Sequence, residues 1–188
     1  MKTKTFLLTV ITILVANMDL QAQSSPVSKK KILVTCFSHS GNTRVIAEQI
    51  KDATGGDIFE VQPVKDYPDD YNTVVDQAKK EINANYKPAL KTQVKNIETY
   101  DVIFVGSPCW WGTITPPVAT FLSSYDLSGK TIVPFMTHEG SGMGHSVSDI
   151  KKLCPKSTVL DGLPIRGSSV KRAQNDVIKW LQKIKMIK

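Results

Sequence analysis

Short apolar runs recur along the chain, and segments with a helical period separate them. The runs at 32–37, 102–106 and 131–137 are almost continuous and rich in β-branched residues. This composition is typical of strands that are buried on both faces of a sheet. Shorter runs at 58–61 and 158–160 resemble them. The pattern therefore predicts five strands.

Apolar positions between these runs predict helices, because they recur every three or four residues. The segment 44–53 places Val45, Ile46, Ala47 and Ile50 on one face, and the pair Gly55-Gly56 ends it. Further helices are expected at 72–83, 116–125, 147–153 and 170–184.

Strands that alternate with helices predict an α/β domain, in which a parallel sheet has right-handed crossovers and helices on both faces. In such a sheet, ligands bind at the carboxyl ends of the strands. The loops after the first, third and fourth strands are therefore the candidate functional segments.

The first 22 residues have the pattern of a secretory signal peptide. Lys2 and Lys4 precede an uncharged apolar run at 5–18, and Ala22 supplies a small residue at the cleavage point. The run is shorter than the roughly 20 residues that a membrane span needs. We expect residues 1–22 to be removed, 23–30 to form a linker and 31–188 to form the domain; the alternative is a buried N-terminal helix. The protein is then exported, periplasmic or secreted, without a stable membrane anchor.

Composition narrows the function classes. Hydrophobic residues make up 41% and charged residues 22% of the 188, as in globular domains. Three cysteines exclude a disulfide scaffold. The net charge of +7 suits an anionic ligand or partner, but no Lys/Arg block is dense enough to predict nucleic-acid binding. The histidines and cysteines lack metal-ligand spacing, so no metal site is predicted.

The loop after the first strand combines polar side chains with the start of a helix. Backbone N–H groups and the dipole at a helix N-terminus favour an anion, and nearby hydroxyl groups complete a phosphate site without a lysine. The alternative is an ordinary turn with a helix cap. The residues are Ser38, His39, Ser40, Gly41, Asn42 and Thr43.

The loop after the third strand contains two adjacent tryptophans. They cannot both point into one core from a regular element, so at least one is expected to face a cleft and stack on an aromatic ligand. The alternative is that both pack locally under the loop. The candidate residues are Pro108, Cys109, Trp110, Trp111, Gly112 and Thr113.

The loop after the fourth strand is rich in glycine, which leaves backbone N–H and C=O groups free to line a heteroaromatic ring. A flexible surface loop is the alternative. The candidate residues are Thr137, His138, Glu139, Gly140, Ser141 and Gly142.

These three motifs resemble those of the flavodoxins, in particular bacterial flavodoxin-like proteins with a Trp-Trp-Gly loop. The segment 38–43 matches the phosphate pattern Ser/Thr-x-Ser/Thr-Gly-Asn-Thr, and Pro108-x-Trp110-Trp111-Gly112 matches the loop that covers the flavin. The resemblance extends from Lys31 to the C-terminus. It implies a flavodoxin-like, doubly wound, five-stranded parallel sheet of order 2-1-3-4-5.

The resemblance also implies non-covalent FMN and electron transfer. Ser38, Ser40, Asn42 and Thr43 would hold the phosphate, and Trp110 or Trp111 would stack on the ring. The electrons would pass to a redox partner protein or a small-molecule acceptor.

Two departures from the family keep other functions open. The third loop has no aromatic residue between His138 and His145, which would leave one ring face open. An open face favours an NAD(P)H-dependent reductase of quinones or nitro compounds.

The chain is basic where flavodoxins are usually acidic, and its histidines, His39, His138 and His145, all lie in these loops. We expect a raised redox potential that rises further at low pH. A non-redox module that binds a phosphate-bearing ligand is a third possibility.

The resemblance places Cys36 and Cys109 at the ends of neighbouring strands. They could form a disulfide if their Cα atoms lie within about 7 Å. Two buried free thiols are the favoured interpretation.

Overall fold

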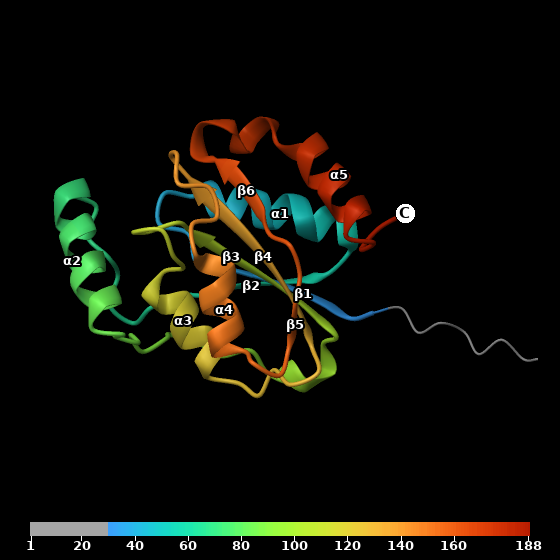
Figure 1. The fold of residues 1–188 in the computed structure, drawn as a ribbon, viewed down its shortest axis with the longest axis horizontal. Coiled ribbons are helices and arrows are strands. Elements are labelled where there is room, and N and C mark those ends of the chain that lie inside the picture. Colours follow the sequence, from blue (N-terminus) through green and yellow to red (C-terminus); the bar gives the residue numbers. More distant parts are fainter. Residues whose placement is uncertain (1–29) are drawn as a thin grey trace, which may run out of the picture.

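The computed structural model describes residues 30–188, which form one parallel sheet with helices on both faces (Figure 1). The predicted signal peptide and nearly all of the linker lie outside these residues. The strands are ordered β2 (Asp57–Glu60), β1 (Ile32–Cys36), β3 (Val102–Pro108), β4 (Thr131–His138) and β5 (Thr158–Val159), and every adjacent pair is parallel. This arrangement confirms the predicted order 2-1-3-4-5.

A sixth strand, β6 (Leu163–Arg166), lies beside β4 at the same edge of the sheet as β5. It pairs in parallel with the last four residues of β4, whereas β5 pairs with the first two. The hydrophobic pattern of the sequence did not predict this strand. Gly162 and Pro164 interrupt its apolar run, and proline within a sheet is restricted largely to strand edges.

Helices α1 (Asn42–Thr54) and α5 (Gln174–Lys183) cover one face of the sheet, and α3 (Pro116–Ser123) and α4 (Ser146–Leu153) cover the other (Figure 1). The predicted closing helix 170–184 begins as the 3-10 helix η2 (Gly167–Arg172). Its buried residues Gly167 and Val170 are three positions apart, the spacing that a 3-10 helix places on one side. No helix within 30–188 is both long and apolar enough to cross a membrane.

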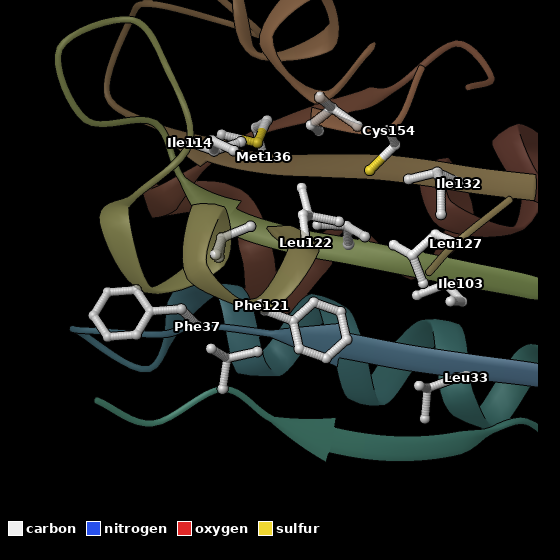
Figure 2. Close-up of a cluster of buried hydrophobic side chains, with 14 of the residues drawn as sticks. Leu33, Phe37, Ile103, Ile114, Phe121, Leu122, Leu127, Ile132, Met136 and Cys154 are labelled. Carbon is white, nitrogen blue, oxygen red and sulfur yellow. The ribbon is translucent and has the colours of Figure 1, made fainter. Parts of the chain in front are cut away.

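Two hydrophobic clusters hold these layers together, because successive strand residues point to opposite faces. Ile103 and Ile132 join the cluster beneath α3 and α4, whereas Phe104 and Val133 join the cluster beneath α1 and α5. Figure 2 shows the first cluster, in which side chains of the strands and of α3 meet. Phe121 is fully buried there, and replacing it with alanine would cost about 3–5 kcal/mol.

Helix α2 (Tyr71–Asn83) stands to one side of the sheet (Figure 1). The carboxylate of Asp70 caps its first turn by accepting a hydrogen bond of 2.8 Å from the backbone N–H of Thr73. The helix buries only Val74 and Ala78. A long irregular segment with one short 3-10 helix, η1 (Ile97–Thr99), then leads to β3. This placement leaves much of one α2 face available to the loops at the carboxyl end of the sheet.

Candidate functional site

The loop between β1 and α1 turns at Gly41, which has a left-handed φ of 89°. A side chain would be strained in this conformation, yet a Cβ on Gly41 would meet no atom within 4 Å, so the space above it is open. The first N–H groups of α1 have no partner within the helix, and its dipole favours an anion there. Ser38 Oγ accepts a hydrogen bond of 3.2 Å from the N–H of Arg44. The loop therefore leaves space beside the free N–H groups at the start of α1, an arrangement that can hold an anion.

Two other residues of this loop brace it. Thr43 is buried, and its Oγ1 lies 2.8 Å from Oγ1 of Thr137 at the end of β4. His39 Nε2 lies 2.9 Å from the carbonyl oxygen of Pro68 and must carry the proton, because a carbonyl only accepts. The His39 ring also meets that of Trp110 edge-on. These contacts tie the first loop to the second and third.

The second loop contains a two-residue hairpin. Trp110 and Thr113 exchange two backbone hydrogen bonds of 3.0 Å, and Trp111 and Gly112 between them have φ of 50° and 79°. Positive φ at both central positions defines a type I′ turn, for which glycine at the second position is favoured. The turn gives the two tryptophans different surroundings.

Trp110 is partly buried, and its ring packs edge-on against those of Phe37 and Tyr67. Trp111 is 49% exposed. Its Nε1 donates a hydrogen bond of 3.0 Å to the carbonyl oxygen of Val75, and Lys79 Nζ lies 4.6 Å from its ring centre. The hairpin thus connects the end of β3 with α2.

The third loop packs on this hairpin. A Cβ on Gly144, whose φ is 51°, would overlap the carbonyl oxygen of Gly112, so the two backbones approach closely. The N–H of His145 donates to that same carbonyl at 2.7 Å. Nearer to β4, Nδ1 of His138 accepts a hydrogen bond of 3.0 Å from the N–H of Gly140. Nε2 of a neutral His138 therefore carries the proton.

Asp149 of α4 connects the hairpin and the third loop to that helix through hydrogen bonds. Its Oδ2 accepts hydrogen bonds from Thr113 Oγ1 at 2.7 Å and His145 Nδ1 at 2.5 Å, and its Oδ1 accepts one from Lys152 at 3.0 Å. Burial opposes ionisation of Asp149, but these three hydrogen bonds outweigh it and lower the pKa of the carboxyl group. Thr113 therefore anchors the hairpin to α4 through its hydrogen bond to Asp149.

These loops and α2 enclose a cleft of about 770 Å³, within the range of small-molecule sites. Twelve of the predicted residues line it: His39, Ser40, Asn42, Pro108, Cys109, Trp110, Trp111, Gly112, Thr137, His138, Glu139 and Ser141. Six do not line it: Ser38, Gly41, Thr43, Thr113, Gly140 and Gly142. Of these six, Thr43 and Thr113 point their hydroxyl groups at Thr137 and Asp149 instead.

One wall of the cleft was not predicted. It is formed by Asp69 and by Tyr71, Val74, Val75 and Ala78 of α2. The last four have the spacing of one helix face, so the sequence did contain an apolar stripe on this otherwise exposed helix. Gly167 also lines the cleft, where a Cβ would overlap Glu139 and press on Asn42. That close approach had no signal in the sequence.

The charges lining the cleft differ from the charge of the whole chain. Among the described residues, the charged side chains that line it are Asp69 and Glu139, with no lysine or arginine. His39 and His138 also line it, whereas His145 lies beneath the hairpin, bonded to Asp149. The excess positive charge therefore lies elsewhere on the surface.

All three cysteines are free. Cys36 is buried, as expected, and this burial, aided by Glu60, raises the pKa of its thiol to about 12. Cys109 is only partly buried and lines the cleft, contrary to the expectation that both thiols are buried. Cys109 is thus the cysteine thiol placed to meet a ligand.

Comparison with known proteins gives a consistent result. A family model described as flavodoxin matches residues 31–184. A crystal structure of a candidate flavoprotein from Bacteroides eggerthii is 34% identical, with a TM-score of 0.75, over 85% of this chain and 99% of that one. A second, from Bacteroides uniformis, is 28% identical with a TM-score of 0.73, over 81% and 98%.

A third structure contains a ligand. It is a flavoprotein from Lactobacillus acidophilus in complex with FMN, 27% identical with a TM-score of 0.64, over 76% of this chain and 97% of that one. Comparison with curated proteins found no match.

Proposed function

The chain belongs to the flavodoxin family, and we propose that it binds FMN non-covalently and transfers electrons. One observation carries the proposal: three loops at the carboxyl ends of β1, β3 and β4 meet around a single cleft that combines an anion site with tryptophan rings. The FMN complex of the relative from Lactobacillus acidophilus supports the same ligand.

The groups present fit the two halves of FMN. Ser40, Asn42 and the N–H groups at the start of α1 would hold the phosphate, where the open space above Gly41 leaves room for it. Trp110 or Trp111 would contact the ring, and the backbone of the segment 137–141 would line its polar edge. FMN supplies the redox chemistry when bound, while the protein orients it and sets its electrostatic surroundings.

The charged residues of the cleft act against a high redox potential. Asp69 and Glu139 disfavour any negative charge gained on reduction, because like charges repel. The raised potential expected from the sequence therefore stays a prediction, and the two carboxylates oppose it.

The decisive experiment is an absorbance spectrum of the mature chain, residues 23–188, after FMN is added and the excess removed. Retained bands near about 375 and 450 nm, in a one-to-one ratio with protein, would support the proposal. A colourless protein would contradict it and favour a module for another phosphate-bearing ligand.

One observation favours the reductase as a second candidate. Tyr71 lines the cleft and is 76% exposed, so this wall is accessible from solvent. A planar acceptor could enter beside it. Steady-state oxidation of NADH or NADPH by the FMN-loaded protein, with a quinone or a nitro compound as acceptor, separates a reductase from a carrier. Turnover without a protein partner would establish the reductase.

We also propose that the protein works outside the cytoplasm. The support is the basic, apolar and small-residue pattern of residues 1–22. Mass spectrometry of the protein recovered from a bacterial host should find Gln23 at the N-terminus of an exported fraction. An intact N-terminus in the cytoplasmic fraction would contradict export.

A further inference from the structure

The excess of basic over acidic side chains is concentrated in the last 26 residues of the chain. Residues 163–188 contain seven Lys or Arg and one Asp, which leaves +6. Residues 30–162 contain fourteen basic and fifteen acidic side chains, which leaves −1. The net positive charge of the folded domain therefore comes from β6, η2, α5 and the C-terminal segment, although most of its basic side chains lie elsewhere.

We call the exposed cations of this segment the basic ridge. Of its members, only Arg166 lies within 4.0 Å of a carboxylate, that of Glu139 at 3.9 Å, among the described residues. The apolar side chains of the same segment, including Val177, Leu181 and Ile184, pack into the core beneath α5. The ridge comprises Arg166, Lys171, Arg172, Lys179, Lys183, Lys185 and Lys188, all of them exposed.

The ridge begins at the mouth of the cleft. Arg166 Nη2 donates a hydrogen bond of 2.9 Å to the carbonyl oxygen of Glu139, and Gly167 lines the cleft itself. η2 follows directly after β6, whose last residue Arg166 pairs with His138 at the end of β4 (Figure 1). Any partner held on η2 would therefore lie next to the cofactor site.

The side of the cleft formed by α2 carries a net negative charge. The segment 65–83, which contains α2, has five acidic and three basic side chains, with Asp69 in the cleft wall. The cleft thus has a net negative charge on its α2 side and a net positive charge on its η2 side. Such an asymmetric field orients an approaching charged partner as well as attracting it.

We propose that the basic ridge is the docking surface for an acidic electron-transfer protein. The electron-transfer part of this proposal rests on the proposed FMN function. Charge complementarity selects the acidic partner, and the contact between the ridge and the cleft selects a partner that exchanges electrons there. Within residues 30–188 the large exposed apolar side chains are Ile58, Val64, Tyr71, Tyr86 and Trp111. None of them lies on the ridge, so these residues give it no apolar anchor for a bilayer.

The footprint of an acidic probe protein tests the docking part without any flavin. The probe is a plant-type [2Fe–2S] ferredoxin, titrated into the ¹⁵N-labelled mature chain at about 20 mM and about 300 mM salt. We expect shift changes in η2, α5 and the third loop that disappear at high salt. Absence of shifts at low salt, or a footprint on α3 and α4, would overturn the proposal.

A pair of matched double variants identifies the charges responsible. Lys171→Gln with Arg172→Gln should weaken ferredoxin binding about tenfold at low salt, because both charges belong to η2, whose first residue Gly167 lines the cleft. Lys151→Gln with Lys156→Gln removes the same charge around the C-terminal end of α4 and should change binding by less than about twofold. Equal effects of the two doubles would show a response to net charge alone and would overturn the proposal.

Two further measurements separate the remaining outcomes. In the FMN-loaded protein, one electron passes from the reduced iron–sulfur cluster to the bound flavin, and the ridge double should slow this step as much as it weakens binding. A ridge footprint on a chain that fails to retain added FMN would contradict the proposed function but leave the docking surface. Binding to phosphatidylserine vesicles without any ferredoxin footprint would overturn docking to a protein in favour of a membrane surface.

Discussion

Thr113 and Asp149 are joined by a hydrogen bond of 2.7 Å that fastens the Trp110–Thr113 hairpin to helix α4. The same carboxylate oxygen accepts a hydrogen bond from His145, whose own N–H bonds to Gly112 in the hairpin. One carboxylate thus fixes both the tryptophan loop and the glycine-rich loop. The geometry of the cleft depends on a residue that does not line it.

Replacing Asp149 with asparagine should therefore destabilise the protein in a pH-dependent way. We expect a loss of about 1–2 kcal/mol at pH 7, because Lys152 and His145 lose a charged acceptor. Its lowered pKa means that the carboxylate stabilises the fold above about pH 4, and that this contribution is lost as pH falls through the folded-state pKa. Urea unfolding at pH 7 and at about pH 3 measures the difference, which should shrink at the lower pH.

Asp161→Asn is the matched control, because Asp161 is exposed. It should change the unfolding free energy by less than about 0.5 kcal/mol at either pH. A deficit of Asp149→Asn that is the same at both pH values would contradict the role of the ionised carboxylate.

Gly41→Ala tests the anion site. Gly41 and Gly129 both have positive φ, 89° and 74°, and both have open space where a Cβ would be. Alanine should cost each position about 1–2 kcal/mol of stability. Only Gly41→Ala should weaken FMN binding, by about tenfold or more, because its methyl group enters the space above the start of α1. Fluorescence titration with FMN measures this, and equal affinities in the two variants would place the phosphate elsewhere.

Trp111→Phe tests the link between the hairpin and α2. It keeps an aromatic ring but removes the Nε1 donor to Val75, so FMN affinity should fall about fivefold to tenfold. Trp180→Phe is the comparison, since Trp180 packs against Phe104 between α5 and the sheet and neither residue lines the cleft. It should lower thermal stability and leave the FMN dissociation constant unchanged. An FMN affinity that is unchanged in Trp111→Phe, or that falls equally in both variants, would mean that the contact between Trp111 and Val75 does not support the site.

Alkylation should separate the three thiols. Burial raises the pKa of Cys36 to about 12 and that of Cys154 to about 11, so both should resist iodoacetamide at pH 8 in the folded protein. Cys109 lines the cleft and should react first, and bound FMN should slow its reaction. Mass spectrometry of timed samples measures each site, and unchanged labelling of Cys109 with FMN present would contradict its proximity to the cofactor.

Local patterns were enough to predict most of the fold. The apolar runs at 32–37, 102–106 and 131–137 correspond to the three central strands, because a strand buried on both faces must be apolar throughout. The motif at 38–43 likewise lies at the strand–helix junction, since its turn chemistry is contained in adjacent residues. Strand β6 was missed because its pairing with β4, and not its own composition, makes it a strand.

The roles of individual loop residues were decided by tertiary structure. Thr43 and Thr113 have the same side chain as other candidates, but partners 94 and 36 positions away bind their hydroxyl groups, and neither residue lines the cleft. The α2 wall and the position of the basic ridge also depend on how distant segments pack. The sequence by itself determined the elements, their order and the three motifs, because periodicity and turn chemistry act between near neighbours. Only the folded chain decided which side chains face the cleft, because that depends on contacts between residues far apart in the sequence.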